Sequence, residues 1–294
     1  MHLLILGHGY SASFLSPRLL AKGWTVAGTT RNATAGFGDD RIEQIIWPRD
    51  SDAVRHHISR ADAILTSVAP GSTGDPVLRE FAQDLSQAAP KWVGYLSSTN
   101  VYGDHGGAWV DETTKPSPSS ARARARVEAE AAWADLSRRA GWPLNIFRLA
   151  GIYGPGRGPF AKLRAGTARC IVKPGQIFSR IHAEDIAGAV ETAITRAIAE
   201  QAVGVEIFNL CDDQPAPPQE TIRRAAEMLG LPTPPEEPFE QAEMSAMARS
   251  FYADSKRVRN DRMKTQLGYH LRYPDLDSGL TAILEAEKGT EGTE

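Results

Sequence analysis

The chain has 294 residues, of which 41% are hydrophobic and 23% charged, and its formal net charge at pH 7 is −3. This length allows one large α/β domain, or a nucleotide-binding domain joined to a smaller lobe. The nearly balanced charge gives no reason to expect affinity for nucleic acid or membranes, and no apolar run approaches the ~20 residues of a membrane span.

The first thirty-one residues predict a strand, a glycine turn, a helix and a second strand. Residues 2–6 form a short apolar run, typical of a strand that is buried on both faces. The turn 7–12 follows at once, apolar residues then recur at helical spacing, and residues 24–30 have the pattern of the next strand. This order of elements is the context that a dinucleotide-binding turn requires.

The glycine turn assigns a role to each small residue. Gly7 permits the tight turn out of the strand, Gly9 lets a pyrophosphate approach the backbone, and Ala12 stands where a third glycine would allow close helix–strand packing. The helix then begins with free N–H groups and the positive end of its dipole at the phosphates. We also expect His8 to contact a cofactor phosphate. The first part of the predicted cofactor site comprises Gly7, His8, Gly9, Tyr10, Ser11 and Ala12.

The end of the second strand indicates which dinucleotide binds. An NAD-binding protein usually has Asp or Glu about 20 residues past the glycines, where the acid holds the ribose hydroxyls. This chain has Thr30 and Arg31 there and no acid. The Arg31 guanidinium can pair with a 2′-phosphate, although a solvated surface arginine would give the same pattern. We therefore expect NADP(H) in preference to NAD.

Strand and helix patterns continue to alternate up to residue 159. Strands are expected at 42–47, 63–68, 92–96 and 143–149, with helices at 54–59, 76–89 and 120–140. This alternation is typical of an α/β fold with a Rossmann-type, doubly wound parallel sheet. Ligands in such sheets sit at the carboxyl ends of the strands. The cofactor site is therefore extended by residues at these ends: Thr30, Arg31, Val68, Ala69, Pro70, Ser97, Ala150 and Gly151.

Beyond Pro159 the pattern changes. The expected elements are a helix at 160–166, a hairpin around 173–175, a helix at 183–196, a further strand of the main sheet at 205–210 and a helix from 217 to 229. We thus expect a Rossmann domain at 1–159 and a small mixed, α-rich substrate lobe at 160–288 that is interleaved with the sheet. Residues 289–294 have the composition of a disordered tail.

The two cysteines, Cys170 and Cys211, are too few for a disulfide framework, and neither lies in a metal-binding motif. The first ten residues lack the basic segment of a signal peptide. We therefore expect a cytoplasmic protein without a metal site.

Several stretches together resemble the extended short-chain dehydrogenase/reductases, the NAD(P)-dependent epimerase/dehydratase group. In chain order the matching stretches are 7–12, 97–103, 148–156, 180–187, 208–213 and 255–268. The resemblance covers nearly the whole chain. It implies an NAD(P) cofactor and a small substrate with a carbonyl or hydroxyl group, such as a nucleotide sugar. In this family helices like those near Pro76 and Ser120 pair in dimers, so a homodimer is also implied.

The family's catalysis rests on a Ser or Thr, a Tyr, and a Lys four residues after that Tyr. By resemblance, the Tyr exchanges a proton with the substrate hydroxyl, the Lys lowers the pKa of the Tyr, and the Ser orients the substrate oxygen. Ser98 occupies the serine position. If Glu130 is the family's glutamate four residues after the Lys, then Arg126 replaces the Lys and Arg122 replaces the Tyr.

These two arginines change the chemistry that the resemblance implies. Arg122 stays protonated at any working pH, so it cannot be the acid/base. Arg126 can still bind the cofactor ribose or a phosphate, and two cations at this spacing repel unless an anion lies between them. The same residues would also suit the solvated face of an Ala/Arg helix. The chain thus resembles an atypical, bacterial subgroup with a degenerate active site.

Substitutes for the missing acid/base are few. Asp104 follows the Ser98 loop and could manage the proton, although a loop-surface role would suit it as well. Tyr153 and Arg180 are candidate substrate contacts beside Arg122; the tyrosine belongs to a motif whose tyrosines usually pack, and the arginine suits an anionic group. Three hypotheses remain: an NADP(H)-dependent oxidoreductase or epimerase with altered proton handling, a non-catalytic NADP(H)-binding sensor or scaffold, and isomerase or lyase chemistry on a nucleotide sugar.

Overall fold

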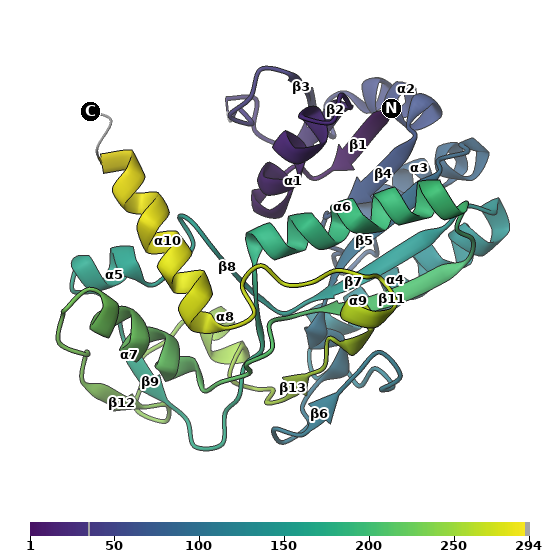
Figure 1. Ribbon diagram of the computed structural model, residues 1–294. Helices are drawn as coiled ribbons and strands as arrows, with labels where there is room; N and C mark the ends of the chain where they lie inside the picture. Colours follow the sequence, from purple (N-terminus) through teal and green to yellow (C-terminus); the bar gives the residue numbers. More distant parts are fainter. Residues whose placement is uncertain (35, 292–294) are drawn as a thin grey trace.

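The computed structural model describes residues 1–34 and 36–291 (Figure 1). Seven strands form its central sheet: β1 (His2–Leu6), β2 (Thr25–Thr30), β3 (Ile42–Ile46), β4 (Ala63–Thr66), β5 (Trp92–Ser98), β7 (Leu144–Leu149) and β11 (Val205–Leu210). Their order is β11-β7-β5-β4-β1-β2-β3, and all six pairings are parallel. The predicted Rossmann-type α/β fold is confirmed.

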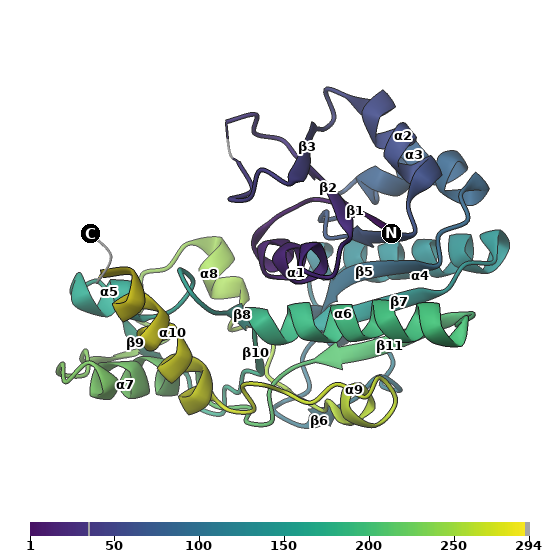
Figure 2. The same ribbon diagram turned by 45° about the horizontal axis from the view of Figure 1, so that its top comes forward.

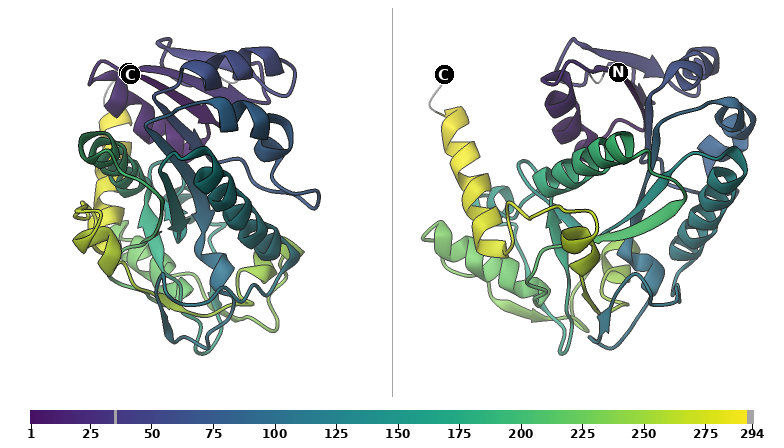
Figure 3. Two further views of the ribbon diagram at one scale, coloured as in Figure 1. Left: turned by 90° about the vertical axis from the view of Figure 1, so that its right-hand side faces the viewer. Right: turned by 45° about the vertical axis from the view of Figure 1, so that its right-hand side comes forward.

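Helices cover both faces of the sheet (Figures 1 and 3). On one face lie α1 (Tyr10–Leu20) and α6 (Ala183–Glu200), and on the other α2 (Ser51–Arg60), α3 (Pro76–Gln87) and α4 (Ala121–Ala140). In β1, Leu3 and Ile5 belong to the first core while Leu4 and Leu6 belong to the second. Successive side chains of a strand point to opposite faces, so a doubly covered strand must be apolar throughout.

Capping residues in the sequence set the ends of the second helical layer. The Asp75 carboxylate accepts hydrogen bonds from the Val77 and Leu78 N–H groups at 2.8 and 3.2 Å at the start of α3. Ser120 caps α4 in the same way, and Gly141 ends that helix in the left-handed region at a φ of 80°. Both helices thereby begin within one residue of their predicted starts, and α4 also ends at its predicted residue.

The C-terminal part forms a lobe at one end of the sheet (Figure 2). Its helices are α5 (Phe160–Arg164), α7 (Pro218–Met228), α8 (Ala246–Ser250) and α10 (Leu276–Glu291), while α9 (Asp261–Thr265) lies beside β11. Three short parallel pairs complete the chain: β8 (Gly151–Tyr153) with β10 (Arg180–His182), β9 (Cys170–Val172) with β12 (Glu236–Pro238), and β6 (Trp109–Val110) with β13 (Arg257–Val258).

The structure corrects two expectations for this lobe. The predicted hairpin around residues 173–175 does not form, because β9 pairs in parallel with β12, a strand more than sixty residues later. Residues 289–291, expected in a disordered tail, continue α10, and 292–294 lie outside the described residues. As predicted, β11 returns the chain to the main sheet. In the described part of the chain, no helix combines the length and apolarity that crossing a membrane would require.

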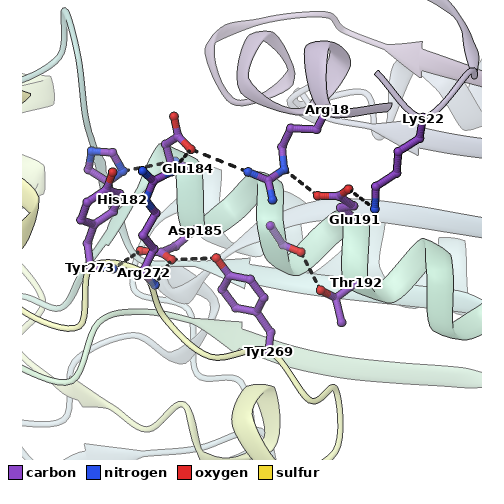
Figure 4. A network of polar contacts seen from close by, with 11 residues as sticks. Arg18, Lys22, His182, Glu184, Asp185, Glu191, Thr192, Tyr269, Arg272 and Tyr273 are labelled. Atoms are coloured by element: carbon purple, nitrogen blue, oxygen red, sulfur yellow. Dashed lines mark hydrogen bonds and ion pairs between the residues drawn. The ribbon is translucent and has the colours of Figure 1, made fainter. Parts of the chain in front are cut away.

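Ionic and polar contacts hold α6 to its neighbours (Figure 4). Glu191 pairs with Arg18 and Lys22 of the α1 region, each at 2.6 Å. The buried carboxylate of Asp185 accepts from the Tyr269 hydroxyl at 2.8 Å and from the backbone N–H groups of residues 272 and 273. The segment that leads to α10 is therefore fixed to the sheet domain through α6.

Candidate functional site

A cavity of about 880 Å³ lies where the carboxyl ends of β1, β4, β5 and β7 face the C-terminal lobe. Ligands bind in this position in open α/β sheets. The cavity brings together many of the predicted site residues: Gly9, Tyr10, Ser11, Ser97, Ser98, Arg122, Arg126, Ala150, Gly151, Tyr153 and Arg180. The sheet edge and the lobe thus form one site from segments distant in sequence.

The glycine turn has the geometry that a dinucleotide requires. Gly7 has a φ of +86°, and an added Cβ would lie 3.0 Å from Ser67 Oγ, so only glycine fits without strain. At Gly9 an added Cβ would meet nothing closer than the Gly7 oxygen at 4.0 Å, and this residue lines the cavity. The turn leaves open backbone at the start of α1, where the helix dipole favours a phosphate. The residues present therefore fit an NAD(P) cofactor.

The prediction that His8 contacts a phosphate is wrong. Its side chain is buried, with Nε2 2.8 Å from Ser16 Oγ and the ring against Phe37 at a centroid distance of 4.0 Å. Burial lowers the pKa of His8 to about 4, so the ring is neutral at pH 7. A side chain between two glycines of a turn can face either the ligand or the core. The His8 imidazole faces the core and packs under α1.

Five residues predicted for the cofactor site flank β1 outside the cavity. Thr30 ends β2 and Arg31 follows it, Val68 to Pro70 follow β4, and these two strands are the neighbours of β1. Arg31 is exposed, and the turn 30–34 contains no acidic side chain. The Thr30 hydroxyl accepts from the Asn32 N–H at 3.2 Å. Arg31 is therefore an exposed cation at this edge of the sheet, where we expect a 2′-phosphate.

The two serines that end β5 have different surroundings. Ser97 is buried, and its hydroxyl donates to the Glu130 carboxylate at 2.5 Å. Ser98 lines the cavity, and its Oγ accepts from the Asn100 N–H at 3.2 Å at the start of the short helix η1 (Thr99–Tyr102). Because Oγ accepts in this bond, its proton stays available for a substrate oxygen.

Two arginines of α4, Arg122 and Arg126, line the cavity, but only Arg126 is held by hydrogen bonds. Arg126 donates to the Leu96 carbonyl at 2.8 Å and to the Tyr95 hydroxyl at 3.1 Å, and its guanidinium lies 5.6 Å from the centre of the Tyr95 ring. Arg122 is exposed at the cavity wall one turn earlier. Neither arginine can take the place of a proton-exchanging tyrosine.

A buried ion pair lies beside Ser97. Glu130 accepts from Arg148 Nη2 at 2.7 Å, and both side chains are less than a tenth exposed. Arg148 Nη1 donates to the Tyr102 hydroxyl, which in turn donates to Asn209 at 2.7 Å. Burial raises the pKa of Tyr102 to about 12. Tyr102 therefore belongs to the core network and supplies no catalytic proton.

Asp104 does not reach the cavity. Its carboxylate accepts from the Ser255 N–H at 2.8 Å and from the Gly106 N–H at 3.2 Å. The bond to Ser255 is the main reason that the pKa of Asp104 is lowered. A carboxylate that is ionised and bound to backbone groups cannot serve as the proposed proton donor, so the structure gives Asp104 a positioning role.

That contact leads to Lys256, which sequence reasoning missed as a site residue. Lys256 is buried and lines the cavity, and its Nζ donates to the Gly103 carbonyl at 2.8 Å and lies 3.7 Å from Asp254. Burial lowers the pKa of its amine. The stretch 255–258 had indicated the family but not a cavity side chain, because the lysine becomes part of the site only when β13 pairs with β6.

The lobe side of the cavity is formed by Arg180 and Tyr153. Arg180 is 8% exposed, and its bonds to the carbonyls of Phe178 and Pro217 are long, at 3.4 and 3.3 Å, which leaves donors for a ligand. Tyr153 is buried, with its hydroxyl 3.4 Å from the Asp275 carbonyl and its ring against that of His182. Tyr153 thus packs, as tyrosines of its motif usually do, and it also lines the cavity, where the substrate contact is expected.

The charged side chains that line the cavity are mostly cationic. They are Arg122, Arg126, Arg157, Arg180 and Lys256, with Asp254 as the one acid among the described lining residues. A cavity with this charge attracts anions. Within residues 1–34 and 36–291, no group of three or more His, Cys, Asp or Glu side chains is placed to hold a metal ion.

The chain belongs to the NAD dependent epimerase/dehydratase family, whose pattern matches residues 3–211. It is 29% identical over 287 residues to the protein YeeZ of Escherichia coli strain K12, covering 92% of this chain and 96% of that protein. The family match confirms the resemblance inferred from the sequence and makes the chain an NAD(P)-dependent epimerase-like protein.

Solved structures support the same fold. A functionally unknown conserved protein from Silicibacter pomeroyi is 47% identical, with a TM-score of 0.88 over 97% of this chain and 98% of that chain. A mutant UDP-glucuronic acid 4-epimerase from Bacillus cereus, in complex with a fluorinated UDP-glucuronic acid and NAD, is 18% identical, with a TM-score of 0.77 over 99% of this chain and 100% of that chain. At that identity the second likeness concerns the fold alone.

Proposed function

We propose that the chain is an NADP(H)-dependent oxidoreductase or epimerase-like enzyme that acts on a carbonyl or hydroxyl group of a small anionic molecule. The observation that carries the proposal is that one cavity combines the open glycine turn, the Ser98 hydroxyl and a cationic wall. The cofactor, when bound, supplies or accepts the hydride.

The cofactor would be held by residues of the sheet edge. The backbone of Gly9 to Ser11 suits the pyrophosphate, and Arg126 suits the ribose or a phosphate. Arg31, in a turn without an acid, supports a preference for the 2′-phosphate of NADP(H). The proposed preference for NADP(H) differs from the Bacillus cereus complex, which contains NAD.

The substrate would lie between Ser98 and the lobe. The Ser98 hydroxyl orients the reacting oxygen, while Arg122 and Arg180 bind an anionic group from opposite sides of the cavity. The complex of the Bacillus cereus epimerase with a UDP sugar supports nucleotide sugars as one substrate class to test, because a diphosphate suits the cationic wall.

Two assays test this proposal: steady-state oxidation of NADPH with a panel of carbonyl compounds, and chromatography of a panel of nucleotide sugars for epimerised product, because epimerisation consumes no net NADPH. We expect turnover with at least one anionic substrate. The Ser98→Ala variant should lose most of this turnover. Absence of turnover across the panel, despite tight NADPH binding, would instead favour the alternative function.

That alternative is a non-catalytic NADP(H)-binding sensor or scaffold. The observation in its favour is that Arg126 is bonded to Tyr95 and Leu96, and the resemblance implies that Arg122 replaces the family's tyrosine. A sensor should bind NADPH and NADP⁺ with affinities that differ clearly, because it reports the redox state of the pool. Equal affinities without turnover would exclude the enzyme and the sensor and would leave the scaffold.

A further inference from the structure

We propose that Arg157 is a cofactor-binding residue that clamps the pyrophosphate of the bound dinucleotide from the lobe side of the cavity. The inference rests on the proposed cofactor binding and deepens it. The cofactor contacts predicted from the sequence lie on the glycine turn, the strand ends and Arg126, whereas Arg157 belongs to the loop 154–159 between β8 and α5. We call this loop the strap.

The strap is attached directly to the glycine turn. The Tyr10 hydroxyl, from the first residue of α1, donates to the Pro155 carbonyl at 2.9 Å. The approach is close: a Cβ on Gly154 would lie 2.6 Å from that hydroxyl oxygen, so the position requires glycine. Gly158 on the same strap has Ile283 of α10 as its neighbour, at 3.6 Å from an added Cβ. The strap thus connects the start of α1 with the lobe.

Arg157 extends from the strap over the place where the pyrophosphate would bind. Its guanidinium lies 5.5 Å from the centre of the Tyr10 ring, and it lines the same cavity as Gly9 and Ser11. A guanidinium that faces a ring can turn to a phosphate a few ångströms away and bind two of its oxygens at once.

Arg157 is an exposed cation, and none of the described carboxylates forms an ion pair with it. Two other arginines of the lobe, Arg164 and Arg169, form ion pairs with Glu287 and Glu237. Within residues 1–34 and 36–291 no carboxylate forms an ion pair with Arg157, whose contact is the Tyr10 ring. The open glycine backbone below and this cation above are complementary to a single dianionic group.

Calorimetric titration of Arg157→Ala separates this contact from the one proposed for Arg31. Because NADPH and NADH share the pyrophosphate, Arg157→Ala should weaken both by a similar factor of roughly 10, the size of one lost charge-assisted contact. Arg31→Ala should weaken NADPH alone. Adenosine 2′-monophosphate, which lacks the 5′-phosphate that forms half of the pyrophosphate, should bind the wild type and Arg157→Ala equally.

Controls distinguish the possible failures. Lys162→Ala removes an exposed cation from the adjacent helix α5 and should leave both affinities unchanged. Arg157→Lys should recover part of the loss. If the wild type binds NADPH tightly and Arg157→Ala binds it equally well, the clamp is refuted while cofactor binding stands. If the wild type binds neither dinucleotide, the proposed function itself fails and the clamp fails with it.

Discussion

Replacing Glu130 with alanine should destabilise the fold more than any exposed charge change on the same helix. The Glu130 carboxylate accepts from Ser97 at 2.5 Å and from Arg148 at 2.7 Å, and the side chains of the ion pair are 7% and 4% exposed. Without it, the buried guanidinium keeps the Tyr102 hydroxyl as its polar contact. Breaking a buried pair on one side costs about 3–5 kcal/mol, because the remaining charge stays desolvated.

Urea unfolding followed by circular dichroism measures this cost. The matched control is Asp135→Ala, which breaks the exposed α4 pair between Asp135 and Arg139, whose side chains are 61% and 66% exposed. An exposed pair of this kind contributes less than about 0.5 kcal/mol. The double variant Glu130→Gln with Arg148→Met should recover much of the loss, since it removes the uncompensated charge. Equal midpoints for Glu130→Ala and Asp135→Ala would refute the reasoning.

Three further outcomes follow from the structure. Burial holds the pKa of His8 near 4 in the folded state, against about 6.5 in the unfolded chain. The stability that the neutral His8 ring contributes is therefore complete above pH 6.5 and is lost as the pH falls toward 4. His8→Gln should flatten the dependence of the urea midpoint on pH between these values. Asp185→Ala should lower the unfolding free energy by roughly 3 kcal/mol, with Asp185→Asn intermediate, because three donors lose their acceptor; equal thermal midpoints for the two variants would contradict this. Ser98→Ala should leave the calorimetric affinity for NADPH within about twofold while lowering turnover of any identified substrate roughly 100-fold, and a loss of binding instead would make Ser98 a cofactor residue.

The sheet could be predicted because its signals are local. Apolar runs such as residues 2–6 and 63–66 must be buried on both faces, and helices with apolar residues spaced by four, such as Val77, Phe81 and Leu85 in α3, must cover them. The glycine turn was recognisable for the same reason. Each of these patterns spans fewer than thirty residues, so it can be recognised without knowing which distant segments pack against it.

Two residues of the far side, Lys256 and Arg157, could not be predicted, because contacts between distant segments bring them to the cavity. Lys256 enters the cavity through the pairing of β13 with β6, and Arg157 through a hydrogen bond between Tyr10 and Pro155 that spans 145 residues. The prediction for His8 failed for a related reason, since only the packing against Phe37 decides which way the ring points. Sequence patterns give the residue types, and tertiary contacts decide which of them face a ligand.

The most direct test of the account is calorimetric titration of the wild type and Arg31→Ala with NADPH and with NADH. The account predicts that the wild type prefers NADPH and that Arg31→Ala loses this preference by weakening NADPH while leaving NADH unchanged. Equal affinity of the wild type for both dinucleotides would contradict the assignment of Arg31. Binding of neither would mean that the glycine turn is structural and that the cavity serves a different ligand.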